Sequence, residues 1–215
     1  MKLPRETPVM TLPNATLFPQ ALLPLYIFEP RYRQMLADAL NSNRMFAVAM
    51  QKPGSQRELP SPVAGLGLIR VSVRHKDNTS HLILQGVARV ELEQAVSYKP
   101  YRVQRIHAME TPPCDNVVAD ALLAKVRELL RERVELGLKF PDPGGKESIA
   151  PEEILKYLDS LTDPEKAADL VSCAVLPGGV ERQTILETVD VEGRLRRLIQ
   201  FLLMEIRRKK KGNAI

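Results

Sequence analysis

Three histidines and two cysteines are the residues of this chain whose types could support metal binding or nucleophilic chemistry. His75 and His81 flank a short turn and could face each other across two strands. Two imidazoles without a nearby cysteine or a suitable carboxylate are an incomplete zinc site. His107 and Cys114 could form a thiolate pair, but nothing in the sequence brings them within bonding reach. We therefore expect no metal site and no catalytic cysteine.

The neighbouring carboxylates Glu152 and Glu153 could be considered for acid–base catalysis. They follow Pro151, a residue suited to the first turn of a helix, where the helix dipole favours negative charge. Their position therefore has a structural explanation, and we do not expect them to be catalytic.

Nucleotide hydrolysis would require a phosphate-binding loop of the pattern Gly-x-x-x-x-Gly-Lys followed by Ser or Thr. The nearest candidate, Gly145-Lys146, fails because Phe140 occupies the first glycine position and Glu147 replaces the hydroxyl residue. The sequence also contains neither a nucleophile elbow nor a His-Glu-x-x-His zinc helix. These observations argue against an enzyme and against a bound cofactor.

Composition indicates an ordinary globular protein with an aliphatic core. Hydrophobic residues make up 44% and charged residues 27%, whereas aromatic residues make up 5% and tryptophan is absent, so Leu and Val must fill most of the core. The two cysteines, Cys114 and Cys173, suggest no disulfide framework. We therefore expect a cytoplasmic location.

Residues 7–28 contain no charged side chain, which could suggest a membrane span or a signal peptide. Pro8, Pro13, Pro19 and Pro24 interrupt the stretch and remove backbone donors that a helix in lipid would need. No signal-peptide cleavage pattern follows. We expect this stretch to form buried strands and turns of a soluble fold, without a membrane partner.

The net charge of +5 is concentrated in one run, Arg207-Arg208-Lys209-Lys210-Lys211. Without this run, 26 basic residues balance 26 acidic residues. Cationic side chains suit the C-terminal end of a helix, so the run is interpreted as a solvated helix end and only secondarily as an RNA-binding tail.

Hydrophobic periodicity changes near Thr111-Pro112-Pro113, which predicts a β-rich lobe over residues 1–110 and a helical lobe over 111–215. In the first lobe, Ile69, Val71 and Val73 alternate with polar residues, and a turn over residues 75–80 joins them to a second strand at 82–84. Other strands are expected at 8–12, 45–50, 87–92 and 101–109, with one helix starting at Pro30.

The second lobe shows helical spacing throughout. One stripe comprises Val118, Leu122, Val126, Leu129 and Leu130, and a break is expected over residues 140–145. Short helices follow: one opens at Pro151, one follows the capping-box spacing of Thr162–Glu165, and one runs through Ile185 and Leu186. Asp190 is expected to cap a long final helix with the stripe Val191, Leu195, Leu198, Ile199, Leu202, Leu203 and Ile206.

Seven motifs follow one another along nearly the whole chain. They are Leu17-Phe18-Pro19, Leu23-Pro24-Leu25-Tyr26-Ile27-Phe28-Glu29-Pro30-Arg31-Tyr32-Arg33 with Met35, Gly65-Leu66-Gly67-Leu68-Ile69, Gln85-Gly86-Val87-Ala88-Arg89, Pro100-Tyr101, Arg182-Gln183-Thr184-Ile185-Leu186-Glu187 and Asp190-Val191-Glu192-Gly193-Arg194-Leu195. This ordered set resembles the amino-terminal domain family of Lon proteases. Two departures are Gln20, where the family usually has Gly, and Val180, where a polar helix cap is expected.

The resemblance implies an α+β protein: a β-rich, PUA-like pseudobarrel followed by a helical bundle. It also implies a non-catalytic substrate-recognition module for exposed apolar or flexible protein segments, with a role in protein quality control and a separate protease as a further partner. In the first motif, Glu29 and Arg31 are expected to cap the helix and to pair locally. The candidate peptide-binding residues are Leu25, Ile27, Phe28 and Tyr32, although their spacing is more typical of a core.

Two other classes of function remain open. An RNA-binding PUA-like protein would need a basic surface, for which Arg70, Arg74, Lys76 and Arg89 are the best candidates together with the basic run. A small-molecule-binding protein is suggested only by relatives such as the Lon-like domain of cereblon, and the three-tryptophan cage expected there is impossible without Trp.

We predict that the purified chain hydrolyses neither ATP nor casein. Its sequence contains no phosphate-binding loop, and the resemblance covers the amino-terminal domain of Lon proteases but not their Ser–Lys peptidase. A coupled phosphate-release assay and a fluorescent casein assay test this. Activity that follows the protein through several columns and disappears with a designed point substitution in this chain would contradict the prediction.

Overall fold

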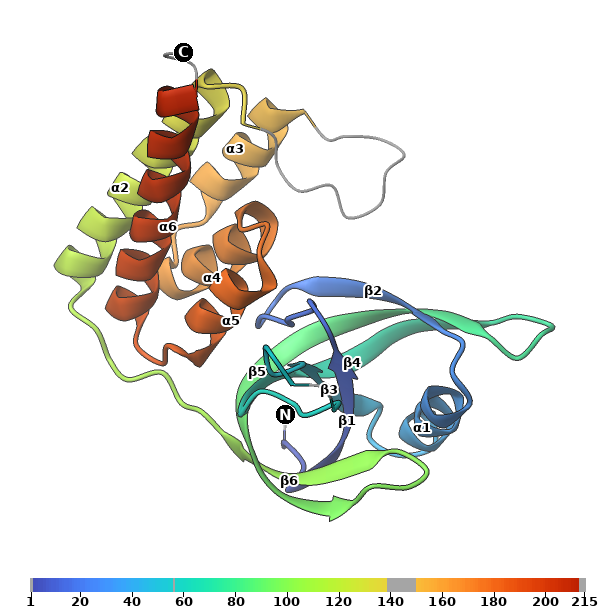
Figure 1. The fold of residues 1–215 in the computed structure, drawn as a ribbon. Helices are drawn as coiled ribbons and strands as arrows, with labels where there is room; N and C mark the ends of the chain where they lie inside the picture. Colours follow the sequence, from blue (N-terminus) through green and yellow to red (C-terminus); the bar gives the residue numbers. More distant parts are fainter. Residues whose placement is uncertain (1, 56, 139–149, 213–215) are drawn as a thin grey trace. The chain divides into compact units, whose positions relative to one another are not determined.

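The computed structural model describes residues 2–55, 57–138 and 150–212. Its contacts divide the chain into two compact units, Met1–Glu110 and Thr111–Ile215. The first unit contains β1 (Glu6–Leu12), β2 (Leu22–Ile27), α1 (Pro30–Leu40), β3 (Met45–Met50), β4 (Val63–Arg74), β5 (Ser80–Ser97) and β6 (Arg102–Ala108). The second contains α2 (Asn116–Glu135), α3 (Pro151–Ser160), α4 (Pro164–Val175), α5 (Gly179–Glu187) and α6 (Val191–Gly212) (Figure 1).

The described strands of the first unit form one mixed sheet in the order β2-β5-β4-β3-β1-β6. β1 and β3 are parallel, and the other pairs are antiparallel. The 18-residue β5 pairs with β2 along its first part and with β6 along its last part, so the sheet closes into a near-barrel. The predicted α+β class, with a pseudobarrel followed by helices, is confirmed.

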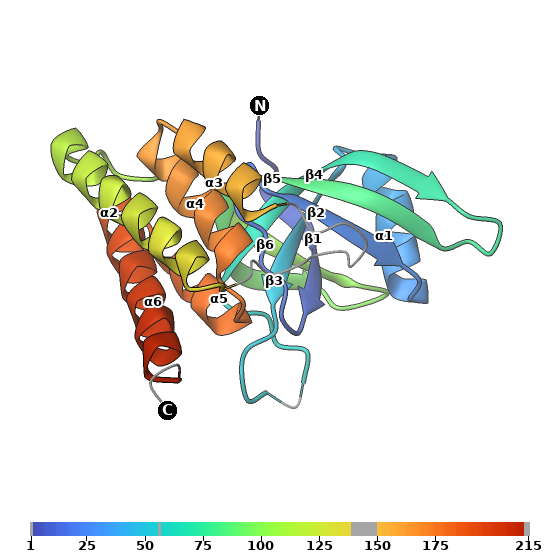
Figure 2. The ribbon, with the colours of Figure 1, turned by 90° about the horizontal axis from the view of Figure 1, so that it is seen from above.

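The β4–β5 hairpin forms at the predicted turn and projects beyond the other strands in both ribbon views (Figures 1 and 2). Asp77 accepts hydrogen bonds from the amide and hydroxyl of Thr79, and Asn78 adopts a left-handed φ of 66°, which Asn tolerates. The runs at 82–84 and 87–92, expected as separate strands, belong to one strand.

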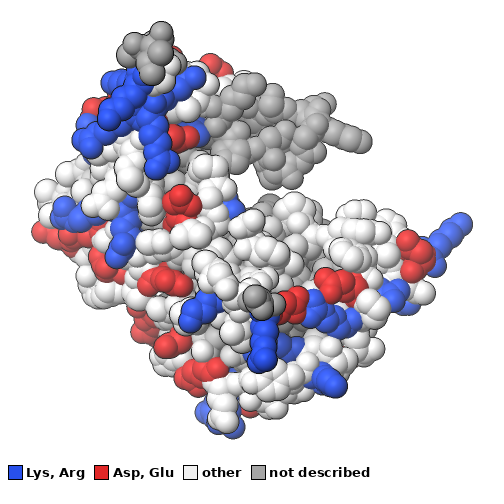
Figure 3. Space-filling view, viewed as in Figure 1, with Lys and Arg blue, Asp and Glu red and all other residues white. Residues whose placement is uncertain are grey.

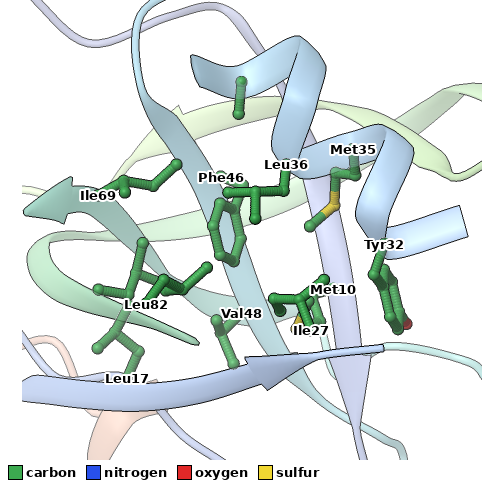
Figure 4. Close-up of a cluster of buried hydrophobic side chains, with 12 residues drawn as sticks. Met10, Leu17, Ile27, Tyr32, Met35, Leu36, Phe46, Val48, Ile69 and Leu82 are labelled. Atoms are coloured by element: carbon green, nitrogen blue, oxygen red, sulfur yellow. The ribbon is translucent and has the colours of Figure 1, made fainter. Parts of the chain in front are cut away.

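A buried cluster between α1 and the sheet forms one core of this unit (Figure 4). Pro30 starts α1 as expected, and the spacing of Tyr32, Met35, Leu36 and Ala39 turns these side chains onto the sheet. They pack against residues from five strands: Met10, Ile27, Phe46, Val48, Ile69, Leu82 and Leu84.

The segment between β1 and β2 crosses the sheet closely at two glycines. A Cβ atom on Gly65 would lie 1.9 Å from the carbonyl oxygen of Leu17, and one on Gly86 would lie 1.9 Å from that of Phe18. Beside this crossing, Gln20 donates its amide to the Gly86 carbonyl and holds a left-handed φ of 68°. Glycine adopts this conformation without strain, so Gln20, at the position where the resemblance predicts Gly, holds a backbone conformation that glycine favours.

The helices of the second unit bury aliphatic stripes, with two corrections to the expected pattern. In α2 the buried positions begin at Ala119 and Leu123, whereas Val118 and Leu122 are half-buried. In α6 the predicted stripe is confirmed at Val191, Leu195, Leu198, Leu202 and Ile206, while Ile199 and Leu203 are half-buried. The expected break at 140–145 lies outside the described residues.

Helix capping partly follows the sequence prediction. Asp190 accepts a hydrogen bond from the Gly193 amide and starts α6 as expected. The N-cap of α4 is Asp163, not Thr162, because the Asp163 carboxylate accepts from the amides of Glu165 and Lys166.

The Glu165 side chain is a hydrogen-bond partner of the fully buried Arg194 of α6. This guanidinium donates to Glu165 and to Asp169, each at 3.1 Å, and to the Thr111 hydroxyl at 2.8 Å. Hydrogen bonds and opposite charges of this kind are what allow a guanidinium to be buried. The network joins α4, α6 and the start of the second unit.

The basic run continues α6 through Gly212, and Figure 3 shows Lys and Arg side chains gathered toward this end of the helix. Arg207 and Arg208 are exposed, and Lys210 lies 2.6 Å from Glu132 of α2. An ion pair at this exposure contributes at most about 1 kcal/mol.

We predict that replacing Gly86 with Ala lowers the free energy of unfolding by about 2–4 kcal/mol, because the new methyl group would overlap the Phe18 carbonyl. Urea denaturation followed by circular dichroism measures the change. Gly212→Ala is the matched control, since nothing lies within 4 Å of the Cβ position. Equal stabilities of the two variants would show that the segment moves aside without cost.

We predict that deleting residues 207–215 lowers the free energy of unfolding by no more than about 1 kcal/mol, the limit for a surface ion pair. Ile206→Ala, which truncates the last buried residue of α6, should cost about 2–5 kcal/mol. Thermal unfolding of both variants provides the comparison. A deletion as damaging as Ile206→Ala would mean that the basic run packs on the body of the unit.

Candidate apolar binding surface

The outer side of the β2-β5-β4 sheet carries a continuous apolar surface. In one row, Tyr26 of β2 lies opposite His81 of β5, which lies opposite Val73 of β4. In the next row Pro24, Ile83 and Val71 are in register. We call the surface formed by Leu22, Pro24, Tyr26, Val71, Val73 and Ile83, together with Phe28 beyond the end of β2, the apolar face.

The large side chains of the apolar face are exposed to an unusual degree. Exposed fractions are 61% for Leu22, 48% for Tyr26, 58% for Phe28, 48% for Val71 and 53% for Val73. The intervening residues of the same strands, including Ile27, Leu82 and Leu84, are buried in the core cluster. The strands are therefore apolar on both sides, and exposed apolar patches of this kind mark interaction sites.

A β-bulge places the two valines on the outer side. In β4, Ile69 lies opposite Leu84, whereas Val71 lies opposite Ile83, so two steps along β4 match one step along β5. The extra residue, Arg70, reverses the alternation, because a bulge shifts the following side chains to the other face. Ile69 is buried, while Val71 and Val73 are exposed, which corrects the prediction that all three share one buried face.

Aromatic and imidazole rings lie together at the hairpin end of the apolar face. The ring centroids of Tyr26 and Phe28 are 5.9 Å apart, and those of Tyr26 and His81 are 4.7 Å apart. Nε2 of His75 lies 2.7 Å from Nδ1 of His81, so the two histidines meet across the hairpin as the sequence allowed. Rigid rings of this kind offer contact area at small entropic cost on binding.

Only one of the four residues expected to bind peptides is freely accessible. Ile27 and Tyr32 are 3% and 6% exposed and belong to the core, and Leu25 packs against it half-buried. Phe28 is exposed and adjoins the apolar face. The expected surface is therefore corrected: alternate residues of β2 point to opposite sides of the sheet, and Leu22, Pro24 and Tyr26 occupy the accessible side.

The sequence contained a signal for this surface that its interpretation missed. Strand β2 is apolar at every position, whereas a strand of an antiparallel pair with one solvated face usually alternates with polar residues. Residues 7–28 were expected to form buried strands and turns, with Leu25, Ile27 and Phe28 as candidate peptide-binding residues. An edge strand such as β2, with apolar residues on both faces, is the pattern that would have indicated an exposed binding face.

The other residues considered for chemistry lie on different elements of the structure. His107 lies on β6 in the first unit, and Cys114 lies before α2 in the second. Glu152 and Glu153 are exposed in the first turn of α3. Burial raises the pKa of the Cys173 thiol, which disfavours the reactive thiolate. Within residues 2–55, 57–138 and 150–212, no three His, Cys, Asp or Glu side chains gather closely enough to hold a metal ion.

The four basic residues considered for RNA do not form one surface. Arg89 is 3% exposed and lies over the Phe18 ring. Arg70 donates to the Gln85 side chain, and Arg74 donates to Asn78 within the hairpin. Arg89 is therefore unavailable to a phosphate.

A family model of the ATP-dependent protease La (LON) substrate-binding domain matches residues 6–203. The chain belongs to this family. The resemblance inferred from the sequence motifs is thereby confirmed, and the match includes both units and every residue of the apolar face.

Curated relatives extend this result to named proteins. The chain is 25% identical over 207 residues to the Lon protease of Dictyoglomus thermophilum, covering 95% of the chain and 25% of that protein. It is 25% identical over 220 residues to the Lon protease of Desulfosudis oleivorans, covering 100% of the chain and 26% of that protein. The chain thus spans about a quarter of the length of these relatives, and the rest of those proteins lies outside the matched region.

Two solved structures show the same fold. The N-terminal domain of the Mycobacterium avium complex Lon protease matches with a TM-score of 0.71 and 20% identity, covering 92% of this chain and 97% of that one. A Lon N-terminal domain protein from Xanthomonas campestris matches with a TM-score of 0.60 and 17% identity, covering 91% and 97%. Among the described helices of this Lon substrate-binding domain, none combines the length and apolar character needed to cross a membrane.

Proposed function

We propose that this Lon substrate-binding domain recognises exposed apolar or flexible protein segments and holds them on the apolar face. The observation that carries the proposal is the set of exposed apolar side chains on β2, β4 and β5, in register across three strands. Family membership supports a role in substrate recognition. The domain would then present the bound segment to a separate protease, and this presentation is the role that we propose for it in protein quality control.

The chemistry of the apolar face favours weak and broad recognition. Burying two or three aliphatic side chains of a client contributes about 3–6 kcal/mol before the cost of ordering the flexible segment. Tyr26, Phe28 and Val73 offer contact area without a closely matched pocket, so many apolar sequences could bind. Because burial drives this association, affinity should depend little on salt.

We predict that the double variant Tyr26→Ser/Val73→Ser binds an unfolded apolar peptide about tenfold more weakly than the unaltered protein. This corresponds to losing about 1.4 kcal/mol of side-chain burial. Fluorescence anisotropy with a labelled peptide measures the affinity, and thermal unfolding confirms that the variant folds. Val117→Ser is the matched control, since Val117 is 77% exposed on α2.

The same peptide titration at 50 mM and 300 mM salt separates burial from charge. Affinity for the peptide should change less than about twofold, whereas RNA binding would weaken steeply as phosphate counterions are released. Unchanged peptide binding by Tyr26→Ser/Val73→Ser would place recognition elsewhere. Tight, salt-sensitive RNA binding without a peptide signal would replace the proposed function with RNA binding.

A further inference from the structure

A cleft lies where strand β6 leaves the side of β1. The two strands pair only over Glu6–Val9, with Val9 opposite Arg102, so the end of β1 lacks a strand on that side. At Thr11 the backbone is hydrogen-bonded by the Tyr32 hydroxyl and not by a neighbouring strand on this side. The hydroxyl accepts from the Thr11 amide and donates to the Thr11 carbonyl, both at 3.3 Å. The backbone groups of Thr11 on the side without a neighbouring strand are thereby partnered.

The cleft has a volume of about 480 Å³ and is bordered by three arginines. Arg31 reaches it from α1, Arg57 from the segment after β3, and Arg102 from the start of β6. The aromatic ring of Tyr98 forms part of its wall and is 66% exposed. This combination of guanidinium groups and an aromatic ring is suited to an anionic group on an organic molecule.

One of the three positive charges is already neutralised. Both terminal nitrogens of Arg31 donate to the Glu58 carboxylate, and its Nε donates to Glu29 at 2.9 Å. The hydrogen bonds from Arg31 lower the pKa of Glu58, so this carboxylate stays ionised at neutral pH. The Arg31–Glu58 pair therefore forms a fixed part of the wall.

The other two arginines retain their charge. The Arg102 guanidinium donates to the backbone carbonyl of Glu58 at 3.3 Å and lies 4.9 Å from the centroid of the Tyr98 ring. Within the part of the chain that the structure describes, neither Arg57 nor Arg102 forms an ion pair with a carboxylate. Two guanidinium groups that form no ion pair among the described residues thus border the cleft.

The cleft is connected to the apolar face through shared residues. A smaller cavity of about 60 Å³ is lined by Tyr26, Phe28, Glu29 and Tyr32, among others. Tyr26 and Phe28 also belong to the apolar face, and Tyr32 also lines the cleft. Tyr32 therefore lies between the small cavity beside Tyr26 and Phe28 and the cleft that the arginines border.

We propose that the cleft binds a carboxylate of the client polypeptide: an acidic side chain or C-terminal carboxylate adjacent to the apolar segment. The proposal deepens the proposed function and rests on it, because the apolar face supplies the neighbouring contact. Arg57 and Arg102 can together bind the two oxygens of one carboxylate, whereas the successive phosphates of RNA would meet, in the described lining, only one further guanidinium, Arg31, which Glu58 already neutralises. The preferred client is thus an apolar segment followed by an acidic group.

The test compares two labelled peptides with the same apolar segment, one followed by two Asp residues and one by two Asn residues, both amidated. The unaltered protein should bind the acidic peptide about threefold to tenfold more tightly at 50 mM salt, with the preference shrinking at 500 mM. In Arg57→Gln/Arg102→Gln the acidic peptide should bind no better than the neutral one. Arg207→Gln/Arg208→Gln removes the same charge from the end of α6 and should keep the preference.

Each other outcome overturns the carboxylate site. Provided that the peptides bind, three results would do so: no preference in the unaltered protein, a preference that survives Arg57→Gln/Arg102→Gln, or a preference equally lost in Arg207→Gln/Arg208→Gln. Tight binding of an RNA oligonucleotide that Arg57→Gln/Arg102→Gln abolishes, without acidic-peptide preference, would assign the cleft to phosphate.

A second measurement separates the cleft from the apolar face. N-acetyl-aspartate amide, which has no apolar segment, is titrated into ¹⁵N-labelled protein. Shifts of the Leu59 and Arg102 amide resonances would support the cleft even if neither long peptide binds, in which case the proposed function alone fails. Absence of shifts at these amides up to millimolar ligand would overturn the carboxylate site directly.

Discussion

The close crossing of residues 17–18 over the sheet is the constraint on which the first unit depends. The carbonyl groups of Leu17 and Phe18 occupy the positions where Cβ atoms of Gly65 and Gly86 would otherwise lie. Because glycine has no Cβ, the connection from β1 can pass directly over β4 and β5 and deliver β2 to the free side of β5. At this crossing the Gln20 amide donates to the Gly86 carbonyl, and the Gly86 amide donates to the Ala21 carbonyl.

The position of β2 beside β5 provides part of the apolar face. It creates a three-stranded region whose inner side continues the core and whose outer side is apolar. The bulge at Arg70 completes the outer side by turning Val71 and Val73 outward. A surface of this kind is usually a liability for aggregation, so its presence on a member of a substrate-binding domain family supports the proposed binding role.

Charged residues have different tasks in the two units. In the second unit, Arg194 is buried among hydrogen-bonding partners and holds helices together. In the first unit, Arg31 is neutralised by Glu58 and forms part of a wall, while Arg57 and Arg102 remain beside an open cleft. Burial with partners indicates a structural role, whereas exposed charge beside a cleft is available to a ligand.

The sequence by itself determined the fold class, the family, and many of the elements. Local signals were sufficient where the physics is local: Pro30 and the following stripe predicted α1, Asp190 predicted the start of α6, and the polar residues after His75 predicted the hairpin turn. These depend on contacts within a few residues along the chain, so no knowledge of the third dimension was needed.

Only the tertiary structure decided which side of each strand is accessible. Ile27 and Tyr32 have the same apolar character as Tyr26 and Phe28, yet the first two are buried and the last two are exposed. Tyr26 and Ile27 point to opposite sides of β2, whose position is set by its pairing with β5, and Tyr32 is buried because α1 packs on the sheet. In β4, one inserted residue turns Val71 and Val73 outward, because a shift of one residue moves every following side chain to the other face. The cleft likewise brings together Arg31, Arg57 and Arg102, whose proximity arises from where β6 leaves β1 and not from their spacing in the sequence.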